Sequence, residues 1–152
     1  MKLAFYAPMK SPDHPVPSGD RRMGRLLWSA LEAAGFEPEL ASSLRSFDGQ
    51  GDTEFQRIKK AEGAEEAAAL IEKWRDRPEE APKGWFTYHV YHKAPDWIGP
   101  EVCRALQIPY FVAEASHAPK RATGNWQIGY EAAAEAISSA RAVFHMTRLD
   151  GE

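Results

Sequence analysis

The chain has 152 residues, which is the size of one ordinary domain and too short for two full ones. Hydrophobic residues make up 43% of it and charged residues 27%, a balance typical of a soluble globular domain rather than of a disordered or fibrous chain. A net charge of −3 argues against a protein that coats DNA, and the single cysteine excludes a disulfide framework and a Cys-rich zinc site.

The first half of the chain alternates strand and helix patterns. A short apolar run at 2–7 predicts a buried strand, and a Pro-rich loop follows it. From Asp20 to Ala34 apolar side chains recur at spacings of three and four, which predicts a helix that ends at Gly35. A second strand is then expected at 37–42, a loop at 43–52 and a long helix at 53–75.

The second half continues this alternation. Residues 85–91 are aromatic and β-branched, which predicts a strand in the middle of the sheet. Pro100 and Glu101 are typical of a helix N-terminus and predict a helix at 99–106. The remaining predicted elements are a strand at 109–114, a polar loop at 115–124, an Ala-rich helix at 125–139 and a last strand at 142–146.

This order indicates parallel strands with helices on both faces. We predict an α/β fold over residues 1–152: a Rossmann-like, doubly wound parallel sheet in three layers, with about five or more strands. No apolar stretch reaches the roughly eighteen residues of a membrane span, and the apolar run near Met1 is too short for a signal peptide. A cytoplasmic protein is therefore expected, while an amphipathic helix leaves peripheral membrane contact open.

The histidines indicate where a ligand binds. In doubly wound sheets ligands bind beyond the carboxyl ends of the strands. His14, His92 and His117 follow the first, third and fourth predicted strands, and His89 and His145 lie in the later halves of strands. This placement favours a polar cleft at that edge, although five residues can also scatter this way by chance.

Cations in the same loops favour an anionic ligand. Arg21, Arg22 and Arg25 open the first helix, and Lys120 and Arg121 follow the fourth strand. Free amides at a helix N-terminus and guanidinium groups both donate to anions. A solvated charged face is the alternative for any one of these side chains.

Two phosphate motifs around Gly19 and Gly24 are incomplete. Arg25-Leu26 stands where a P-loop needs Lys followed by Ser or Thr, and the G-x-G-x-x-G fingerprint lacks a glycine. We therefore expect neither an NTPase nor a nicotinamide enzyme. The indication of a metal site is weak, because His89 and His92 are three residues apart and diverge unless the strand ends between them. Structural histidines are the favoured interpretation.

Other reactive side chains give weaker signals. Ser116-His117 suggests a catalytic triad, but adjacent residues rarely face each other, and a G-x-S-x-G elbow is missing. Glu114, at a strand end, is a better candidate for a functional carboxylate. Cys103 lies on an apolar helix face and is expected to be inert core.

Four stretches of the sequence match a known pattern. They are 2–8 with Ser18-Gly19 and 21–36; His89-Val-Tyr-His92 with 94–100; 107–117, which reads Gln-Ile-Pro-Tyr-Phe-Val-Ala-Glu-Ala-Ser-His; and 142–150. Together they resemble the N-terminal domain of a GT-B glycosyltransferase of the family 4-like type. The family's turn often carries two glycines, where this chain has Ser18 before Gly19.

The resemblance implies transfer of a sugar from a nucleotide-sugar donor to a carbohydrate or lipid-linked acceptor. It implies no cofactor beyond the donor as co-substrate, no metal and no nucleic-acid polymer. His117 would be the catalytic residue in the cleft. The expected substrate-binding residues are Ser18, Gly19, Arg21, Arg22, His92, Glu114, Lys120 and Arg121.

In this family a C-terminal domain holds most of the donor site, and it lies outside residues 1–152. We therefore expect the chain to be the acceptor-side domain, inactive alone. A helix expected after Met146 is also missing, which suggests a fragment with exposed apolar surface and a tendency to self-associate.

Other classes of function stay open. One is a non-catalytic Rossmann-like or flavodoxin-like module for a small anionic or phosphorylated ligand. A response regulator is disfavoured, because Pro8-Met9-Lys10 replaces the acidic residues it needs after the first strand. A flavin site would need more Ser and Thr than Lys10-Ser11-Pro12 supplies. A structural subunit completed by a partner chain is the last alternative.

Overall fold

Five strands form one sheet in the order β2-β1-β3-β4-β5, and every neighbouring pair is parallel. The structure, a computed structural model, describes residues 1–148. Its strands are β1 (Lys2–Tyr6), β2 (Glu37–Leu40), β3 (Trp85–Val90), β4 (Tyr110–Ala115) and β5 (Ala142–Phe144). The predicted doubly wound α/β fold is confirmed, with the aromatic strand β3 at the centre of the sheet.

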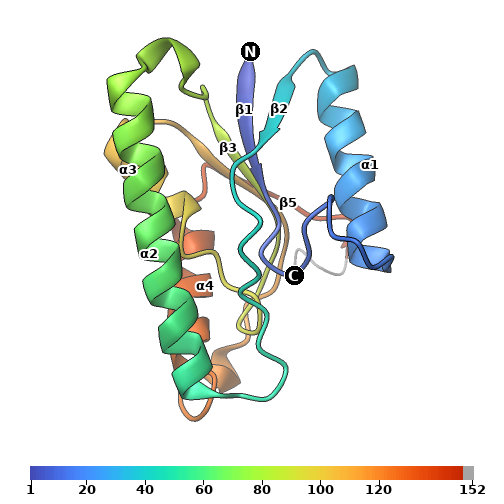
Figure 1. Cartoon of the computed structure of the whole chain (residues 1–152). Helices are drawn as coiled ribbons and strands as arrows, with labels where there is room; N and C mark the ends of the chain where they lie inside the picture. The colour runs from blue at the N-terminus through green and yellow to red at the C-terminus, as the bar shows by residue number, and fades with distance from the viewer. Residues whose placement is uncertain (149–152) are drawn as a thin grey trace.

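Helices cover both faces, which completes three layers. They are α1 (Gly19–Ala33), α2 (Thr53–Asp76), α3 (Gly99–Leu106) and α4 (Gln127–Ser139), with short 3-10 turns η1 (Pro78–Glu80) and η2 (Pro119–Arg121). Helix α1 lies alone on one face, and α2, α3 and α4 lie on the other (Figure 1). All nine strands and long helices expected from the sequence are present, with boundaries within two residues of the prediction.

Local signals explain where the helices begin and end. The Ser18 side chain caps α1 by accepting a hydrogen bond from the Arg21 amide, and Gly35 follows the helix with φ at 91°. Asp52 caps α2 in the same way. Gly63, inside α2, lies buried against Trp97, and a Cβ there would be 2.8 Å from the Trp97 Cβ.

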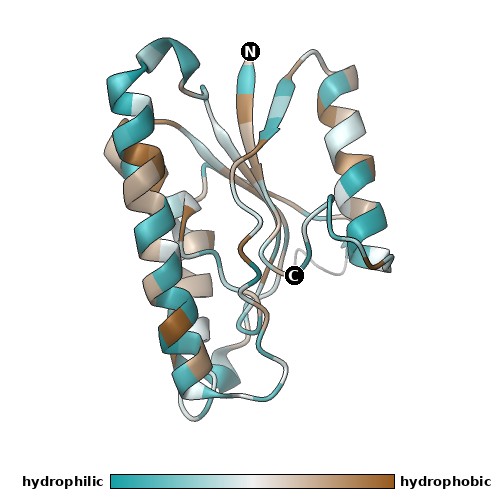
Figure 2. Cartoon of the chain, viewed as in Figure 1, coloured by the Kyte–Doolittle hydropathy of each residue, from teal (hydrophilic) through white to brown (hydrophobic). Residues whose placement is uncertain are grey.

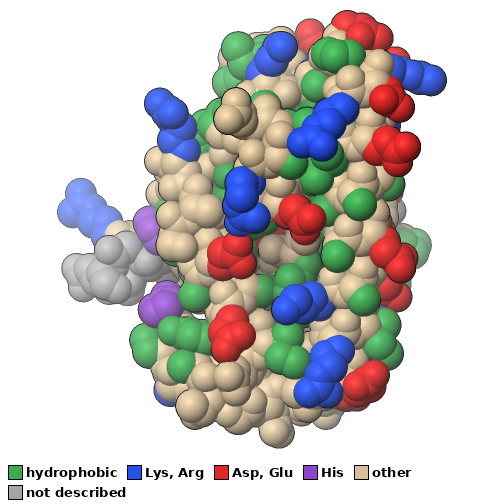
Figure 3. Space-filling view, turned by 90° about the vertical axis from the view of Figure 1, so that its left-hand side faces the viewer, with side chains coloured by type: hydrophobic (Ala, Val, Ile, Leu, Met, Phe, Trp, Pro, Cys, Tyr) green, Lys and Arg blue, Asp and Glu red, His purple; other side chains and the backbone are tan. Residues whose placement is uncertain are grey.

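The outer surface of the three-helix face is polar. Hydrophilic residues dominate the visible side of α2 (Figure 2), and acidic and basic side chains are interspersed when this side faces the viewer (Figure 3). Mixed charges of this kind are typical of a solvated face. Among residues 1–148, no helix combines the length and the apolar composition that crossing a bilayer requires.

The opposite face of the sheet is only partly covered. Helix α1 packs on β1 and β2, where the Trp28 ring meets Phe5 edge-on at 5.4 Å. Farther along this face, Phe86, Phe111 and Phe144 help to line an apolar cavity of about 310 Å³. Phe144 is 51% exposed, so this surface offers apolar contact area. Self-association through it stays a prediction.

Candidate functional site

The chain connections diverge at the carboxyl edge of the sheet. Strand β1 leads through α1 to β2 on one side, whereas β3 leads through α3 to β4 on the other. Such a switch point leaves a crevice outside the carboxyl ends of the two strands. The N-terminus lies at the upper, amino edge in Figure 1, so the carboxyl edge of the sheet is the lower one in that view.

Two residues at this edge have strained backbones. His89 on β3 has a φ of 65°, and Glu114 on β4 has a φ of 59°. Their neighbours on either side pair across β3 and β4, so the two residues lie level in the sheet. Left-handed backbone in a non-glycine residue costs of the order of 1–3 kcal/mol and clusters at functional sites.

The strain reverses the alternation of side chains along β3. Trp85 packs in the core under α2, α3 and α4, whereas Tyr88 packs in the core on the α1 side of the sheet. Because successive side chains of a strand point to opposite faces, strict alternation would place His89 on the same face as Trp85 and bury it there. Instead Val90 packs with Trp85, and His89 turns out of the core.

Strand β4 shows the same reversal at Glu114. Ala113 packs in the α1-side core, whereas Ala115, two positions on, packs against the opposite core. The carboxylate of Glu114 then accepts a hydrogen bond from the Met146 amide at 2.6 Å. The two left-handed residues therefore place an imidazole and a carboxylate at the ligand edge instead of in the core.

Asp20, in the first turn of α1, joins that helix to β3. Its Oδ1 lies 2.8 Å from His89 Nδ1 and accepts from the Tyr88 hydroxyl at 3.3 Å. Burial and the nearby Asp20 carboxylate raise the pKa of Tyr88, so its hydroxyl stays protonated and remains a donor. Asp20, His89 and Glu114 form what we call the polar triplet.

Aromatic rings run along the same edge. The His89 ring stacks on Tyr91 at 4.8 Å, Tyr91 meets His92 edge-on at 5.4 Å, and His92 meets Trp126 edge-on at 5.6 Å. This row leads from the polar triplet to the N-terminus of α4, where Trp126 is the N-cap residue. Ring faces of this kind offer contact area to a ligand.

The residues predicted at the start of α1 mainly serve the fold. Ser18 is the helix cap, and the Arg21 guanidinium donates to the His14 carbonyl oxygen at 3.0 Å. Gly19 is the first helical residue and has open space around it, so nothing near it requires a glycine. Arg22 is exposed. Of these four residues, Ser18 therefore caps the helix and Arg21 holds the loop that precedes it.

The remaining predicted residues lie after β3 and β4. His117 is exposed in the loop after β4, and its Nε2 lies 3.3 Å from the Tyr130 hydroxyl. Within residues 1–148 its ring does not contact the polar triplet. His92 and Arg121 contact Trp126 at the other end of the ring row, and the charge of Lys120 acts on His92.

Sequence reasoning missed Asp20, Tyr88, Tyr91 and Trp126 as site residues. One usable signal was present in the strands. If side chains alternated strictly along each strand, His89 on β3 and Glu114 on β4 would both point into the core. A carboxylate without a partner is almost never buried in a core. A polar residue at a core position predicts a break in the alternation, and both strands break at that point.

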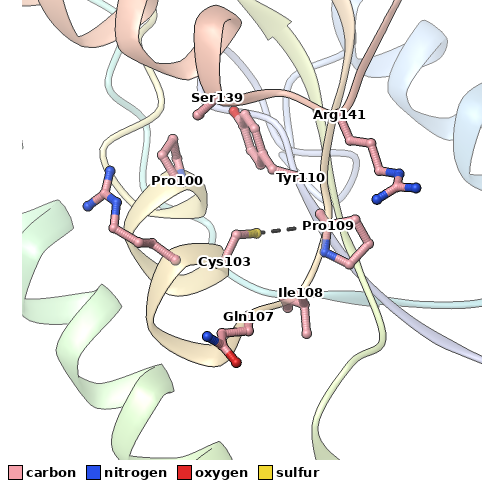
Figure 4. A pocket seen from close by; sticks show the side chains of 9 residues that line it. Pro100, Cys103, Gln107, Ile108, Pro109, Tyr110, Ser139 and Arg141 are labelled. Atoms are coloured by element: carbon pink, nitrogen blue, oxygen red, sulfur yellow. Dashed lines mark hydrogen bonds between the residues drawn. The ribbon is translucent and has the colours of Figure 1, made fainter.

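A second hollow lies at the opposite edge. This cavity of about 440 Å³ is enclosed by the end of α3 and the starts of β4 and β5 (Figure 4). Cys103 faces it and donates to the Pro109 carbonyl oxygen at 3.9 Å, and burial raises the pKa of its thiol. The thiol is therefore a poor nucleophile. Arg104, also lining the cavity, is paired with Glu135 at 2.7 Å.

Replacing His89 or Glu114 by glycine is expected to stabilise the fold by roughly 1 kcal/mol each, because glycine adopts left-handed backbone without strain. The same replacements should remove ligand binding at the carboxyl edge. Urea unfolding measures the first effect. Gln107→Gly is the matched control, since Gln107 has a φ of 54° at the end of α3, away from the triplet. Destabilisation by His89→Gly would show that its contacts outweigh the strain.

Comparisons with known proteins add nothing to this geometry. No family model matches the chain, and neither does any curated protein or solved structure. Among the residues that the structure describes, no three His, Cys, Asp or Glu side chains are grouped so as to hold a metal ion.

Proposed function

We propose that the chain is the acceptor-binding domain of a glycosyltransferase of the GT-B type, and that the polar triplet binds hydroxyl groups of the acceptor. The observation that carries this proposal is the level pair of left-handed residues beside Asp20 at the switch point. Strain of this kind persists where it positions side chains for a ligand. The donor, a nucleotide sugar, would be bound mostly by residues outside this chain.

The chemistry of the triplet suits a polyhydroxyl ligand. Carboxylates accept hydrogen bonds from hydroxyl groups, and a neutral imidazole both donates and accepts. Asp20 and Glu114 supply carboxylates, and the aromatic Tyr91 lies against His89. A sugar ring presents both vicinal hydroxyls and an apolar face, so it can use both kinds of group.

His89 would also suit the role of general base. Asp20 on Nδ1 orients the imidazole and leaves Nε2 for the acceptor hydroxyl. In the transfer, the acceptor oxygen would bond to the anomeric carbon, the bond from that carbon to the diphosphate would break, and the hydroxyl proton would pass to Nε2. His117, on the loop after β4, would contact the sugar from the other side of Glu114.

The test is binding of saccharides to the isotope-labelled chain, followed by NMR. Methyl glycosides and short oligosaccharides should shift the amide signals of Asp20, His89 and Glu114, whereas the chain alone should not transfer sugar from uridine diphosphate glucose. Asp20→Asn should weaken saccharide binding roughly tenfold, the effect of losing one charged hydrogen bond. Asp76→Asn, an exposed change at the end of α2, is the control. Saccharide shifts confined to other regions, or none at all, would refute the proposal.

A further inference from the structure

Two cations lie over one tryptophan at the far end of the ring row, and a third acts on the neighbouring His92. The Arg121 guanidinium lies 4.7 Å from the centre of the Trp126 ring, and the Lys93 ammonium lies 5.2 Å from it. Lys120 precedes Arg121 in η2. We call Lys93, Lys120, Arg121 and Trp126 the basic cluster. The cations come from two segments that are brought together by the fold: the loop after β3 and the loop after β4.

The cations of the cluster are not paired with carboxylates of the described residues. Within residues 1–148, no carboxylate forms an ion pair with any of its three cations. Asp48 lies close by, since its carbonyl oxygen accepts from the Trp126 indole. Its carboxylate accepts hydrogen bonds from three backbone amides and the Gln56 side chain, and it forms no ion pair with the cluster.

The effect of this charge is visible at His92. Burial lowers the pKa of His92, and the charges of Arg121, Lys93 and Lys120 lower it further. Burial is the larger cause, and the three positive charges act in the same direction by disfavouring a further positive charge on the imidazole. An anion placed among the three cations would be stabilised by those same charges.

Buried polar atoms at this place have no hydrogen-bond partner. Both ring nitrogens of His92 and the Nε of Arg121 are buried and unpaired among the described residues. A buried polar group without a partner costs about 1–3 kcal/mol, and native proteins keep few of them. Two such side chains in contact with one tryptophan point to a place where a polar ligand binds.

The N-terminus of α4 adds to the positive potential. Trp126 at the N-cap provides no side-chain hydrogen bond to the first turn. Gly129 in that turn lies so close to the loop after β3 that a Cβ would be 2.1 Å from the His92 carbonyl oxygen. The positive end of the helix dipole is therefore held directly beside His92 and Lys93.

We propose that the basic cluster binds the phosphate group of a small ligand or of a lipid headgroup. A phosphate carries more than one charge and matches the planar fork of a guanidinium. A nucleobase fits less well, because the cations already lie over the Trp126 ring. The inference does not depend on glycosyl transfer, since it rests on charges at the opposite end of the ring row from the polar triplet.

The test compares three probes on the full chain by calorimetry: inorganic phosphate, glucose 1-phosphate, and phosphatidylcholine vesicles with and without phosphatidic acid. Arg121→Gln and Lys93→Gln should each weaken binding roughly tenfold, the usual effect of losing a charge-assisted hydrogen bond. Lys83→Gln is the matched control, because Lys83 is an exposed lysine just before β3, at the opposite edge of the sheet. Circular dichroism confirms that the variants are folded.

Two outcomes would support the proposal, and each would identify a different source of the phosphate group. Binding of the soluble probes indicates a small ligand, and binding only of vesicles with phosphatidic acid indicates a headgroup, provided that Arg121→Gln weakens it. No binding of any probe, or equal weakening by Lys83→Gln, overturns the proposal. Asp20→Asn should leave phosphate binding unchanged, so failure here is distinct from failure of the proposed saccharide site.

Discussion

Replacing Asp96 by alanine is expected to lower the free energy of unfolding by about 3–5 kcal/mol. Asp96 is 2% exposed and accepts four hydrogen bonds. The Ile98 and Gly99 amides donate to Oδ1 at 2.8 Å each, the Thr87 hydroxyl donates to Oδ2 at 2.6 Å, and the Tyr110 hydroxyl donates to Oδ2 at 2.8 Å. Alanine would leave all four buried donors without a partner.

The loss would spread beyond these four groups. The Trp85 indole donates to Thr87, so β3, β4 and the start of α3 are all tied to this one carboxylate. Urea unfolding measures the change. Asp52→Ala is the control: Asp52 caps α2 at the surface, and its loss should cost only about 1 kcal/mol. A loss below 1 kcal/mol for Asp96→Ala would show that the network is dispensable.

The Asp96 carboxyl group should also make the stability of the fold depend on pH. Burial raises the pKa of Asp96 above its ordinary value of 3.8, although its hydrogen bonds act in the opposite direction. The folded state therefore binds the proton more tightly than the unfolded chain. This stabilising contribution is complete below pH 3.8 and is lost as the pH rises through the folded-state pKa. The stability of wild type relative to Asp96→Asn should fall over that window.

The order of the elements could be predicted because its signals are local. Ser18 before a helical pattern, Gly35 after it and Pro100 in a first turn each act within a few residues of the boundary that they mark. Hydrophobic periodicity likewise reports the core-facing side of one element at a time. These signals predict a doubly wound sheet without knowledge of which strands are neighbours.

The site depends on contacts that no local pattern encodes. Asp20 meets His89 across 69 positions of sequence, and it does so only because β3 reverses its alternation next to the start of α1. The basic cluster likewise needs Lys93 and Arg121 to meet on Trp126. Histidines and arginines that follow strands predict a ligand at the carboxyl edge, which is where the polar triplet lies. Arg21 is among the predicted ligand contacts, and in the structure its guanidinium donates to the His14 carbonyl oxygen.

Replacing Gly129 by alanine is expected to lower the free energy of unfolding by about 1–3 kcal/mol, the usual range for overpacking. The new Cβ would lie 2.1 Å from the His92 carbonyl oxygen. This oxygen is a backbone atom, so the clash cannot be relieved by rotating a side chain. A shift of α4 would also break the bond from the Gly129 amide to Gln56, which is 1% exposed.

This replacement also tests whether the close approach of α4 builds the basic cluster. Moving α4 away from His92 would separate Trp126 from Lys93, so Gly129→Ala should weaken phosphate binding more than its loss of stability explains. Gly19→Ala is the matched control, because Gly19 also lies in the first turn of a helix but has no atom within 4 Å of a Cβ. It should leave both properties unchanged. If calorimetry and urea unfolding show equal effects for the two glycines, the contact between α4 and His92 does not organise the site.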